Sequence, residues 1–335
     1  MIGSWKQTVR GLVVWLVILA VLLYLPGHIA RGQQEILLNL LIWVGVAQAW
    51  NIIGGIGGQL SLGNSVFLGV GGYTVAMLVI RSGLGWPLAL VLAGLVSGAV
   101  AYALSFPLLR LSGVYFTIGS SAVAIAALAW MVTWDWTGQS RGLNMPIDAV
   151  PGRNLKFQVI AVLAVLTCVV TYLVLRSTFG LRLMAVRDDE SAASQLGVSP
   201  RHVKQRAFVL SALLTGLMGG AVALNQVSIE PNSMFSLTWT VTALVMTIVG
   251  GMGTLWGPVL GAFVIYYGVD RSLQNQPVLQ ALLSGVLIIA VISLFPGGIM
   301  GALLQIRSWL AGRLGRTPDA GARVPADEPE TVTAA

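Results

Sequence analysis

Long apolar runs separated by short polar connections dominate the chain. Ten runs stand out, at Gly11 to Leu25, Leu37 to Ile53, Ser65 to Ile80, Pro87 to Leu109, Ile118 to Trp134, Val159 to Leu175, Ala207 to Ile229, Trp239 to Val249, Pro258 to Val269 and Val278 to Phe295. A helix needs about 20 apolar residues to cross a bilayer, so most of these runs are candidate spans. The pattern predicts an all-α polytopic membrane protein with about ten transmembrane helices.

The eighth and ninth runs are short and lie close together. Only residues 250–257 separate them, and this segment is rich in glycine. One crossing helix followed by a broken or re-entrant helix would fit the same pattern. The span count can therefore change by one or two.

Composition supports the membrane assignment. Of the 335 residues, 56% are hydrophobic and 9% are charged, whereas a soluble domain carries about 25% charged residues. The spans leave no room for a soluble catalytic domain, so the sequence predicts no enzyme activity. Cys168 is the single cysteine and lies within an apolar run, which excludes a disulfide framework and gives no indication of a metal site or cofactor.

The basic residues predict the orientation of the chain. With ten spans and a cytoplasmic N-terminus, 13 of the 19 Lys and Arg residues fall on the inside, as the positive-inside rule requires. The net charge of +7 is thus explained without nucleic-acid binding. We expect a cytoplasmic N-terminus at residues 1–10, a membrane domain at 11–306 and a cytoplasmic tail at 307–335, whose Pro-rich and acidic composition favours disorder. A signal peptide is the alternative for the first run, but no clear cleavage site follows it.

Charged groups are missing from the predicted membrane interior. All 12 acidic residues lie in loops, at span borders or in the tail, which argues against a proton-coupled carrier. A sodium-coupled carrier needs only backbone and hydroxyl oxygens and stays open. The three lysines precede Gln7, Phe157 and Gln205, so the chain carries no P-loop of its own, and any ATP must be bound by a partner.

Two glycine-rich segments interrupt the apolar pattern. Residues 54–64 read GGIGGQLSLGN and residues 250–261 read GGMGTLWGPVLG. Paired breaks of this kind are typical of internal repeats in transporters, where they line the solute path. A tight turn with glycines for packing is the alternative. The amides Asn39, Gln48, Asn51, Asn225 and Gln226 lie in or near the spans, where such side chains most often join helices.

The loop at 176–206 has the sequence pattern of short helices. Asp188 and Asp189 suit a helix N-terminus, Gly197 can end that helix in the left-handed region, and Ser199 with Pro200 can start the next helix. The loop could dock into a cytoplasmic partner or lie on lipid headgroups as an amphipathic connector. The residues alone favour the connector slightly.

Four segments resemble one known family. They are residues 57–78 (GGQLSLGNSVFLGVGGYTVAML), 109–118 (LRLSGVYFTI), 179–220 (FGLRLMAVRDDESAASQLGVSPRHVKQRAFVLSALLTGLMGG) and 250–262 (GGMGTLWGPVLGA). In this order they are similar to the permease subunits of branched-chain amino acid ABC importers, of the LivM type, over roughly residues 36 to 305. The resemblance implies a multi-pass protein of the cytoplasmic (inner) membrane. Its implied partners are a second homologous permease, two ABC ATPase subunits that bind ATP, and a periplasmic solute-binding protein.

The resemblance also assigns roles to residues. The ATPase-coupling segment, which it favours over the lipid-lying connector, comprises Arg187, Asp188, Asp189, Glu190, Ala192, Ala193 and Gly197. The translocation pathway is expected to include Asn51, Gln59, Ser61, Asn64, Tyr73, Tyr115 and Thr117. The structural glycines are Gly54, Gly55, Gly57, Gly58, Gly250, Gly251, Gly253 and Gly257.

The chain departs from the family pattern at Asn64, at Ser112 and within residues 137–143. These departures leave the solute open, because relatives also carry urea, short amides or other carboxylates. Branched-chain amino acids are the expected solute. A stand-alone sodium-coupled carrier, a passive channel and a scaffold without transport are the alternatives from other classes.

Overall fold

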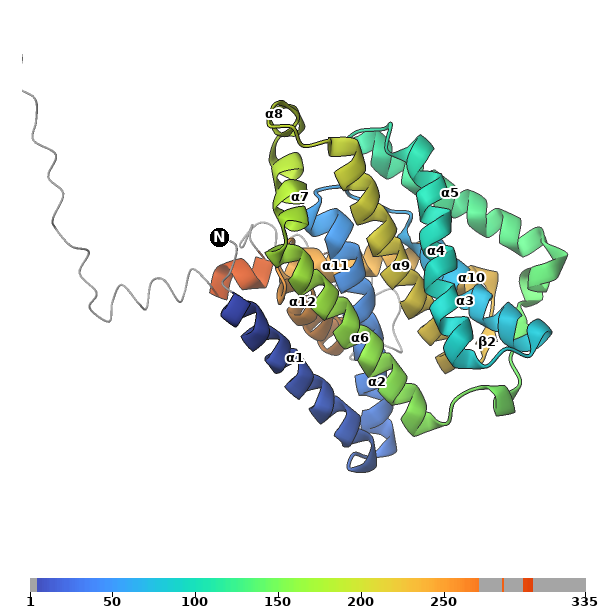
Figure 1. Ribbon diagram of the computed structural model, residues 1–335. Helices are drawn as coiled ribbons and strands as arrows, with labels where there is room; N and C mark the ends of the chain where they lie inside the picture. The colour runs from blue at the N-terminus through green and yellow to red at the C-terminus, as the bar shows by residue number, and fades with distance from the viewer. Residues whose placement is uncertain (1–4, 271–284, 286–297, 304–335) are drawn as a thin grey trace, which may run out of the picture.

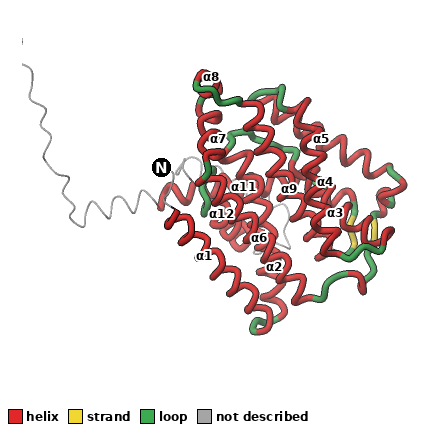
Figure 2. Tube along the Cα trace, viewed as in Figure 1, coloured by secondary structure: helices red, strands yellow, loops and turns green. Residues whose placement is uncertain are grey.

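The computed structural model describes residues 5–270, 285 and 298–303. In this part of the chain eight helices are long and apolar enough to cross a membrane. The first six are α1 (Trp5–Tyr24), α2 (Arg31–Asn51), α3 (Asn64–Ser82), α4 (Trp86–Leu108), α5 (Val114–Thr133) and α6 (Arg153–Arg176). The chain continues through α7 (Thr178–Asp188), α8 (Glu190–Gln195), α9 (Pro200–Gln226), α10 (Pro231–Met234), α11 (Leu237–Gly250) and α12 (Gly257–Ile265). Figures 1 and 2 show a helical bundle that confirms the predicted all-α polytopic class.

The first seven predicted runs each coincide with a helix. The eighth run lies in α11, which together with α10 forms the span Pro231–Gly250. The ninth run forms the short apolar helix Gly257–Gly268, which comprises α12 and the beginning of the π turn Tyr266–Asp270 that follows it. The tenth run, at 278–295, and the tail at 307–335 lie outside the described residues.

The seventh run ends earlier than predicted. Helix α9 stops at Gln226, and Ser228–Ile229 forms strand β2, which pairs antiparallel with β1 (Leu143–Asn144). Gly142 makes this pairing possible, because its φ is +71° and a Cβ there would lie 2.0 Å from the carbonyl oxygen of Ile229. The two short strands tie the α5–α6 connection to the end of α9.

Helix α9 lies at the centre of the bundle and packs against α2, α3, α4 and α6. Its contact with α3 is backbone to backbone: a Cβ on Gly71 would lie 2.1 Å from the Gly216 carbonyl oxygen, and one on Gly219 would lie 2.0 Å from that of Leu68. Close approach through small residues is the ordinary way to pack membrane helices, since lipid supplies no hydrophobic drive between them. Glycine at these positions therefore sets the distance between α3 and α9.

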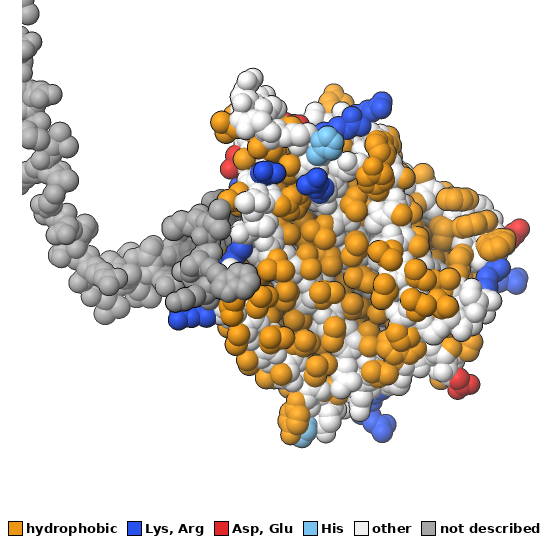
Figure 3. Space-filling model, in the orientation of Figure 1, with side chains coloured by type: hydrophobic (Ala, Val, Ile, Leu, Met, Phe, Trp, Pro, Cys, Tyr) orange, Lys and Arg blue, Asp and Glu red, His pale blue; other side chains and the backbone are white. Residues whose placement is uncertain are grey.

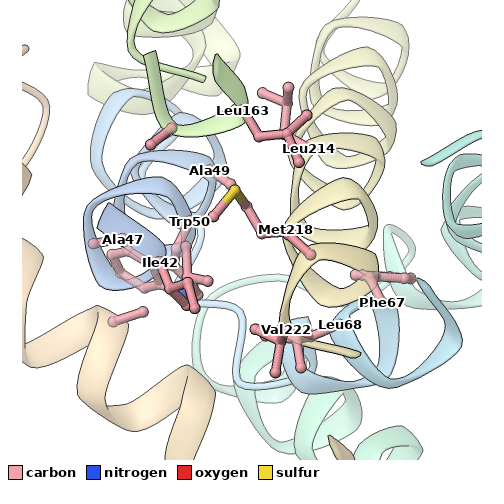
Figure 4. Packing of buried hydrophobic residues seen from close by; sticks show 14 of the residues in the cluster. Ile42, Ala47, Ala49, Trp50, Phe67, Leu68, Leu163, Leu214, Met218 and Val222 are labelled. Atoms are coloured by element: carbon pink, nitrogen blue, oxygen red, sulfur yellow. The ribbon is translucent and has the colours of Figure 1, made fainter. Parts of the chain in front are cut away.

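Larger apolar side chains fill the space between α2 and α9. Met218 of α9 points toward Ala49 and Trp50 of α2 (Figure 4), and all three side chains are buried. Gly45 on α2 leaves the space that Met218 occupies, because a Cβ there would lie 2.6 Å from the sulfur atom. This packing fixes α2, whose end carries the first helix break.

The outer surface of the bundle is apolar. Helix α1 packs against α6, is hardly buried in the structure, and exposes Val13, Leu16, Val17 and Val21. In Figure 3 apolar side chains cover the middle of the visible face, and charged side chains gather toward its two ends. This distribution is that of a bundle surrounded by lipid.

Candidate functional site

The first break joins α2 to α3. Helix α2 ends in a π turn at Ile52–Ile56, and residues 57–63 are not helical before α3 begins at Asn64. Gly58 has φ +67°, and the indole nitrogen of Trp50 donates a hydrogen bond of 2.8 Å to the carbonyl oxygen of Ser61. The expected interruption is therefore present, and it takes the form of a connection between two spans.

The second break joins α11 to α12. Gly251 and Gly253 have φ of +121° and +73°, so the chain reverses there and α12 packs against α11. A Cβ on Gly250 would lie 1.7 Å from the Gly257 carbonyl oxygen. This hairpin needs glycine at Gly250 for close packing and at Gly251 and Gly253 for backbone conformation.

Two amide side chains of α2 join the two breaks. Asn51 accepts a hydrogen bond from the Gly253 amide at 2.9 Å and donates one to the Thr254 carbonyl at 2.9 Å. Gln48 donates to the Leu255 carbonyl at 2.7 Å. Non-helical backbone at membrane depth is stable only where protein or water satisfies its polar groups. We call Gln48, Asn51 and residues 253–255 the amide clamp, since they hold the two breaks together.

Arg187 reaches this junction from the loop between α6 and α9. It sits near the end of α7 and donates from Nη1 to the Gly55 carbonyl oxygen at 3.3 Å. Asp188 holds the guanidinium in place through an ion pair at 2.9 Å. Gly58 lies against the aliphatic part of Arg187, because a Cβ there would come within 2.3 Å of its Cγ. A movement of α7 would thus act directly on the first break.

Two cavities flank Arg187. One has a volume of about 360 Å³, and Gln59, Thr117, Ser112, Glu190 and Lys204 are among its lining residues. The other has a volume of about 420 Å³ and is lined by Gly54, Gly55, Ile248 and Met252, among others. Gly58, Leu60 and Arg187 line both cavities. These residues separate a polar space beside α7 and α8 from a more apolar one beside α11.

The predicted coupling segment forms the end of α7, the short helix α8 and the turn after it. Asp189 caps α8 by accepting hydrogen bonds from the amides of Ser191 and Ala192 at 2.8 and 2.9 Å. Ala193 is buried, and Gly197 ends the segment with φ +78°. The predicted cap and left-handed glycine are confirmed, whereas Asp188 belongs to the end of α7.

One ion pair fastens α8 to α9. Glu190 at the start of α8 pairs with Lys204 of α9, and Leu196 is 82% exposed beyond the helix. Ser199 precedes α9 as predicted, with Pro200 at the first helical position, but its hydroxyl lies 2.8 Å from His202 Nδ1 and does not bond to the helix backbone. The ion pair therefore ties the start of α8 to α9, while Leu196 after the end of α8 stays exposed.

The structure brings only part of the predicted pathway set to a cavity. Gln59 lines the polar cavity, and Thr117 lines it while its hydroxyl donates to the Leu60 carbonyl at 2.9 Å. Asn51 lies in the amide clamp, and Ser61, Asn64 and Tyr73 are buried in the bundle. Tyr115 is 73% exposed on α5. Pathway roles for all seven residues stay predictions.

Some contributors to the site were not among the predicted site residues. Ser112 and Lys204 line the polar cavity, and Gln48 completes the amide clamp. Lys204 is one of six basic residues in its loop, and nothing in the spacing singles it out. Gln48 is recognisable as a polar residue in an apolar run, but its partner is 207 positions away in the chain.

Similarity to known proteins assigns the chain to a family. The family model described as branched-chain amino acid transport system / permease component matches residues 34–292. The chain belongs to this family. The matched range includes both breaks, α7 and α8. The eight long apolar helices of the described residues are those of a multi-pass membrane protein.

Individual relatives agree with this assignment. The chain is 27% identical over 316 residues to the high-affinity branched-chain amino acid transport system permease protein LivM of Salmonella typhimurium, which covers 85% of this chain and 74% of that protein. It is 28% identical to LivM of Escherichia coli, over 80% of this chain and 70% of that protein. The fructose import permease protein FrcC of Rhizobium meliloti is 29% identical over 40% of this chain and 39% of its own length. No solved structure matches the chain.

Proposed function

We propose that the chain is one permease subunit of an ABC importer that moves branched-chain amino acids across the cytoplasmic membrane. Similarity to two LivM proteins over at least 80% of the chain supports the solute class. The matches to a fructose and a ribose import permease cover only 40% and 46% of the chain. A second homologous permease, two ATPase subunits and a solute-binding protein complete the importer, and both termini of this chain face the cytoplasm.

The contact of Arg187 with the Gly55 carbonyl supports the mechanism. An ATPase subunit that pushes on α8 moves α7, because the two helices pack together and share the turn at Asp189. Arg187 transmits that movement to the π turn and to the wall between the two cavities. Nucleotide binding by the ATPases thereby shifts the population between inward-open and outward-open states.

Uptake of labelled leucine in cells that lack the native chain tests this proposal. Gly197→Val is expected to abolish uptake while the protein stays in the membrane, because a β-branched residue is strained at φ +78° and distorts the segment. Gly83→Val is the matched control: Gly83 has φ +59°, no atom of the described chain lies within 4 Å of a Cβ there, and it ends α3, away from α8. It should retain uptake.

Glu190→Lys is likewise expected to abolish uptake. The double variant Glu190→Lys with Lys204→Glu restores the ion pair. Recovery of uptake in this variant would mean that Glu190 acts only through the ion pair, and continued loss would mean that Glu190 itself contacts the ATPase. Normal uptake in both Gly197→Val and Glu190→Lys would contradict the coupling role. Parallel assays with labelled leucine, urea, fructose and ribose identify the solute, and uptake of a sugar without uptake of leucine would contradict the amino acid assignment.

A further inference from the structure

A third cavity lies on the outside of the bundle, between the N-terminal part of α1 and the C-terminal end of α6. Its volume is about 370 Å³, and Arg10, Trp15, Tyr172, Arg176 and Trp256 are among its lining residues. Trp15 and Trp256 stack at a centroid distance of 5.3 Å and close one side. Arginine and aromatic side chains at the ends of spans mark the level of the lipid headgroups. The cavity therefore opens where the headgroups lie.

The polar part of the cavity is basic. Arg176 and Arg10 both line it, and its described lining residues include no acidic side chain. The guanidinium of Arg176 lies 4.9 Å from the centre of the Tyr172 ring, a cation–π contact that orients it but supplies no hydrogen-bond acceptor oxygen. The Nη1 atom of Arg176 is shielded from solvent and has no hydrogen-bond partner among the described residues. A buried donor of this kind is costly unless an acceptor reaches it, and the charged oxygens of a phosphate or a carboxylate form the strongest hydrogen bonds with arginine.

The other part of the cavity is apolar and continues along α1. Val14 lines the cavity, and Val13, Val17 and Val21 of the same helix are exposed. A free phosphate ion would use only the two arginines. An acyl chain would use the apolar surface as well, so the combination favours a lipid over a soluble anion.

We propose that this cavity binds the phosphate group of an anionic phospholipid between Arg10 and Arg176, with the acyl chains lying along α1. The site is separate from both cavities at Arg187, and it does not depend on the transported solute. Basic pockets between membrane helices on the cytoplasmic side are suited to such headgroups, because negative lipids are attracted there by charge as well as by hydrogen bonds.

Native mass spectrometry of the full-length protein in detergent, titrated with phosphatidylglycerol, tests the proposal. Arg176→Gln and Arg10→Gln are each expected to lower the fraction of lipid-bound protein about tenfold, since each removes one charged donor. Arg176→Lys keeps the charge and should lie between wild type and Arg176→Gln. Arg110→Gln is the matched control, because Arg110 is an exposed arginine at the end of α4 and does not line the cavity.

Each of three outcomes would overturn the proposal. Equal binding of phosphatidylcholine and phosphatidylglycerol, or undiminished binding in Arg10→Gln, would overturn the proposal. Arg10 is exposed, so its variant is expected to fold even if Arg176→Gln does not. Displacement of the lipid by millimolar inorganic phosphate would identify a soluble anion as the ligand and overturn the lipid assignment. Loss of leucine uptake alone has no bearing on this site, because the readout is bound lipid.

Discussion

The carboxamide of Asn51 forms hydrogen bonds with two backbone groups of the second break at once. Its oxygen accepts from the Gly253 amide and its nitrogen donates to the Thr254 carbonyl, and the side chain is fully buried. Each group left unpaired in the interior would cost about 1–3 kcal/mol. The role that the contacts give Asn51 is thus to join two spans that are distant in sequence.

Asn51→Leu is therefore expected to lower the thermal denaturation midpoint of the purified protein by several degrees. Asn39→Leu is the matched control on the same helix, since within the described part of the chain the Asn39 amide bonds only to the Glu35 carbonyl of its own helix. Differential scanning fluorimetry in detergent compares the two. Equal midpoints for both variants would show that the amide clamp contributes nothing to stability.

The sequence identifies these polar positions but not their hydrogen-bond partners. Asn51 and Gln48 are conspicuous as amides in an apolar run, and interhelical bonding was the expected role for such side chains. Their partners lie more than 200 positions further along. Hydrophobic periodicity carries no information about contacts at that separation, so only the folded chain shows that the two breaks meet.

Among the elements, the hairpin of α11 and α12 depends most clearly on glycine. Gly261 of α12 faces α11, where a Cβ would lie 1.7 Å from the Met246 carbonyl oxygen. A methyl group there cannot be accommodated by a side-chain rotation, because the atom it meets is backbone. The two helices would have to separate.

Gly261→Ala is expected to destabilise the protein by about 1–3 kcal/mol and to increase protease sensitivity near the second break. Gly268→Ala, three residues beyond α12, meets no described residue within 4 Å and should be neutral or stabilising by about 0.5 kcal/mol. Limited proteolysis and thermal denaturation of both variants give the comparison. A stable Gly261→Ala variant would mean that α11 and α12 can pack at a larger distance.

Element boundaries were predictable where a span ends in polar residues and less so elsewhere. The caps at Asp189 and Gly197 follow from local residue preferences and are present. The end of α9 at Gln226 was placed three residues too late. Val227, Ser228 and Ile229 are suited to either helix or strand, and the pairing with β1 that decides between them is non-local.

At the scale of the whole molecule, the orientation in the membrane is open to a direct test. Ile147 and Leu196 are both 82% exposed, and α6 with the short segments beside it separates them along the chain. They therefore lie at opposite ends of the bundle. Cys168, the single cysteine in the sequence, is buried and provides an internal negative control.

In intact cells a membrane-impermeant maleimide is expected to label Ile147→Cys and not Leu196→Cys. Disruption of the membrane should make Leu196→Cys reactive, because it removes the barrier and leaves the side chain as exposed as before. The unmodified chain should stay unlabelled in both conditions. The reverse pattern in intact cells would place both α8 and the N-terminus outside, and it would exclude contact with a cytoplasmic ATPase.

The backbone contact between α3 and α9 has a consequence for how such proteins can diverge. Positions such as Gly71 and Gly219 cannot take a side chain without moving a central helix, whereas Gln59 and Ser112 meet open space in the polar cavity. Substitutions are therefore restricted at the glycines between the helices and tolerated at the residues that line the cavity. The side chains that line the cavity can therefore change while the framework of helices that carries them stays the same.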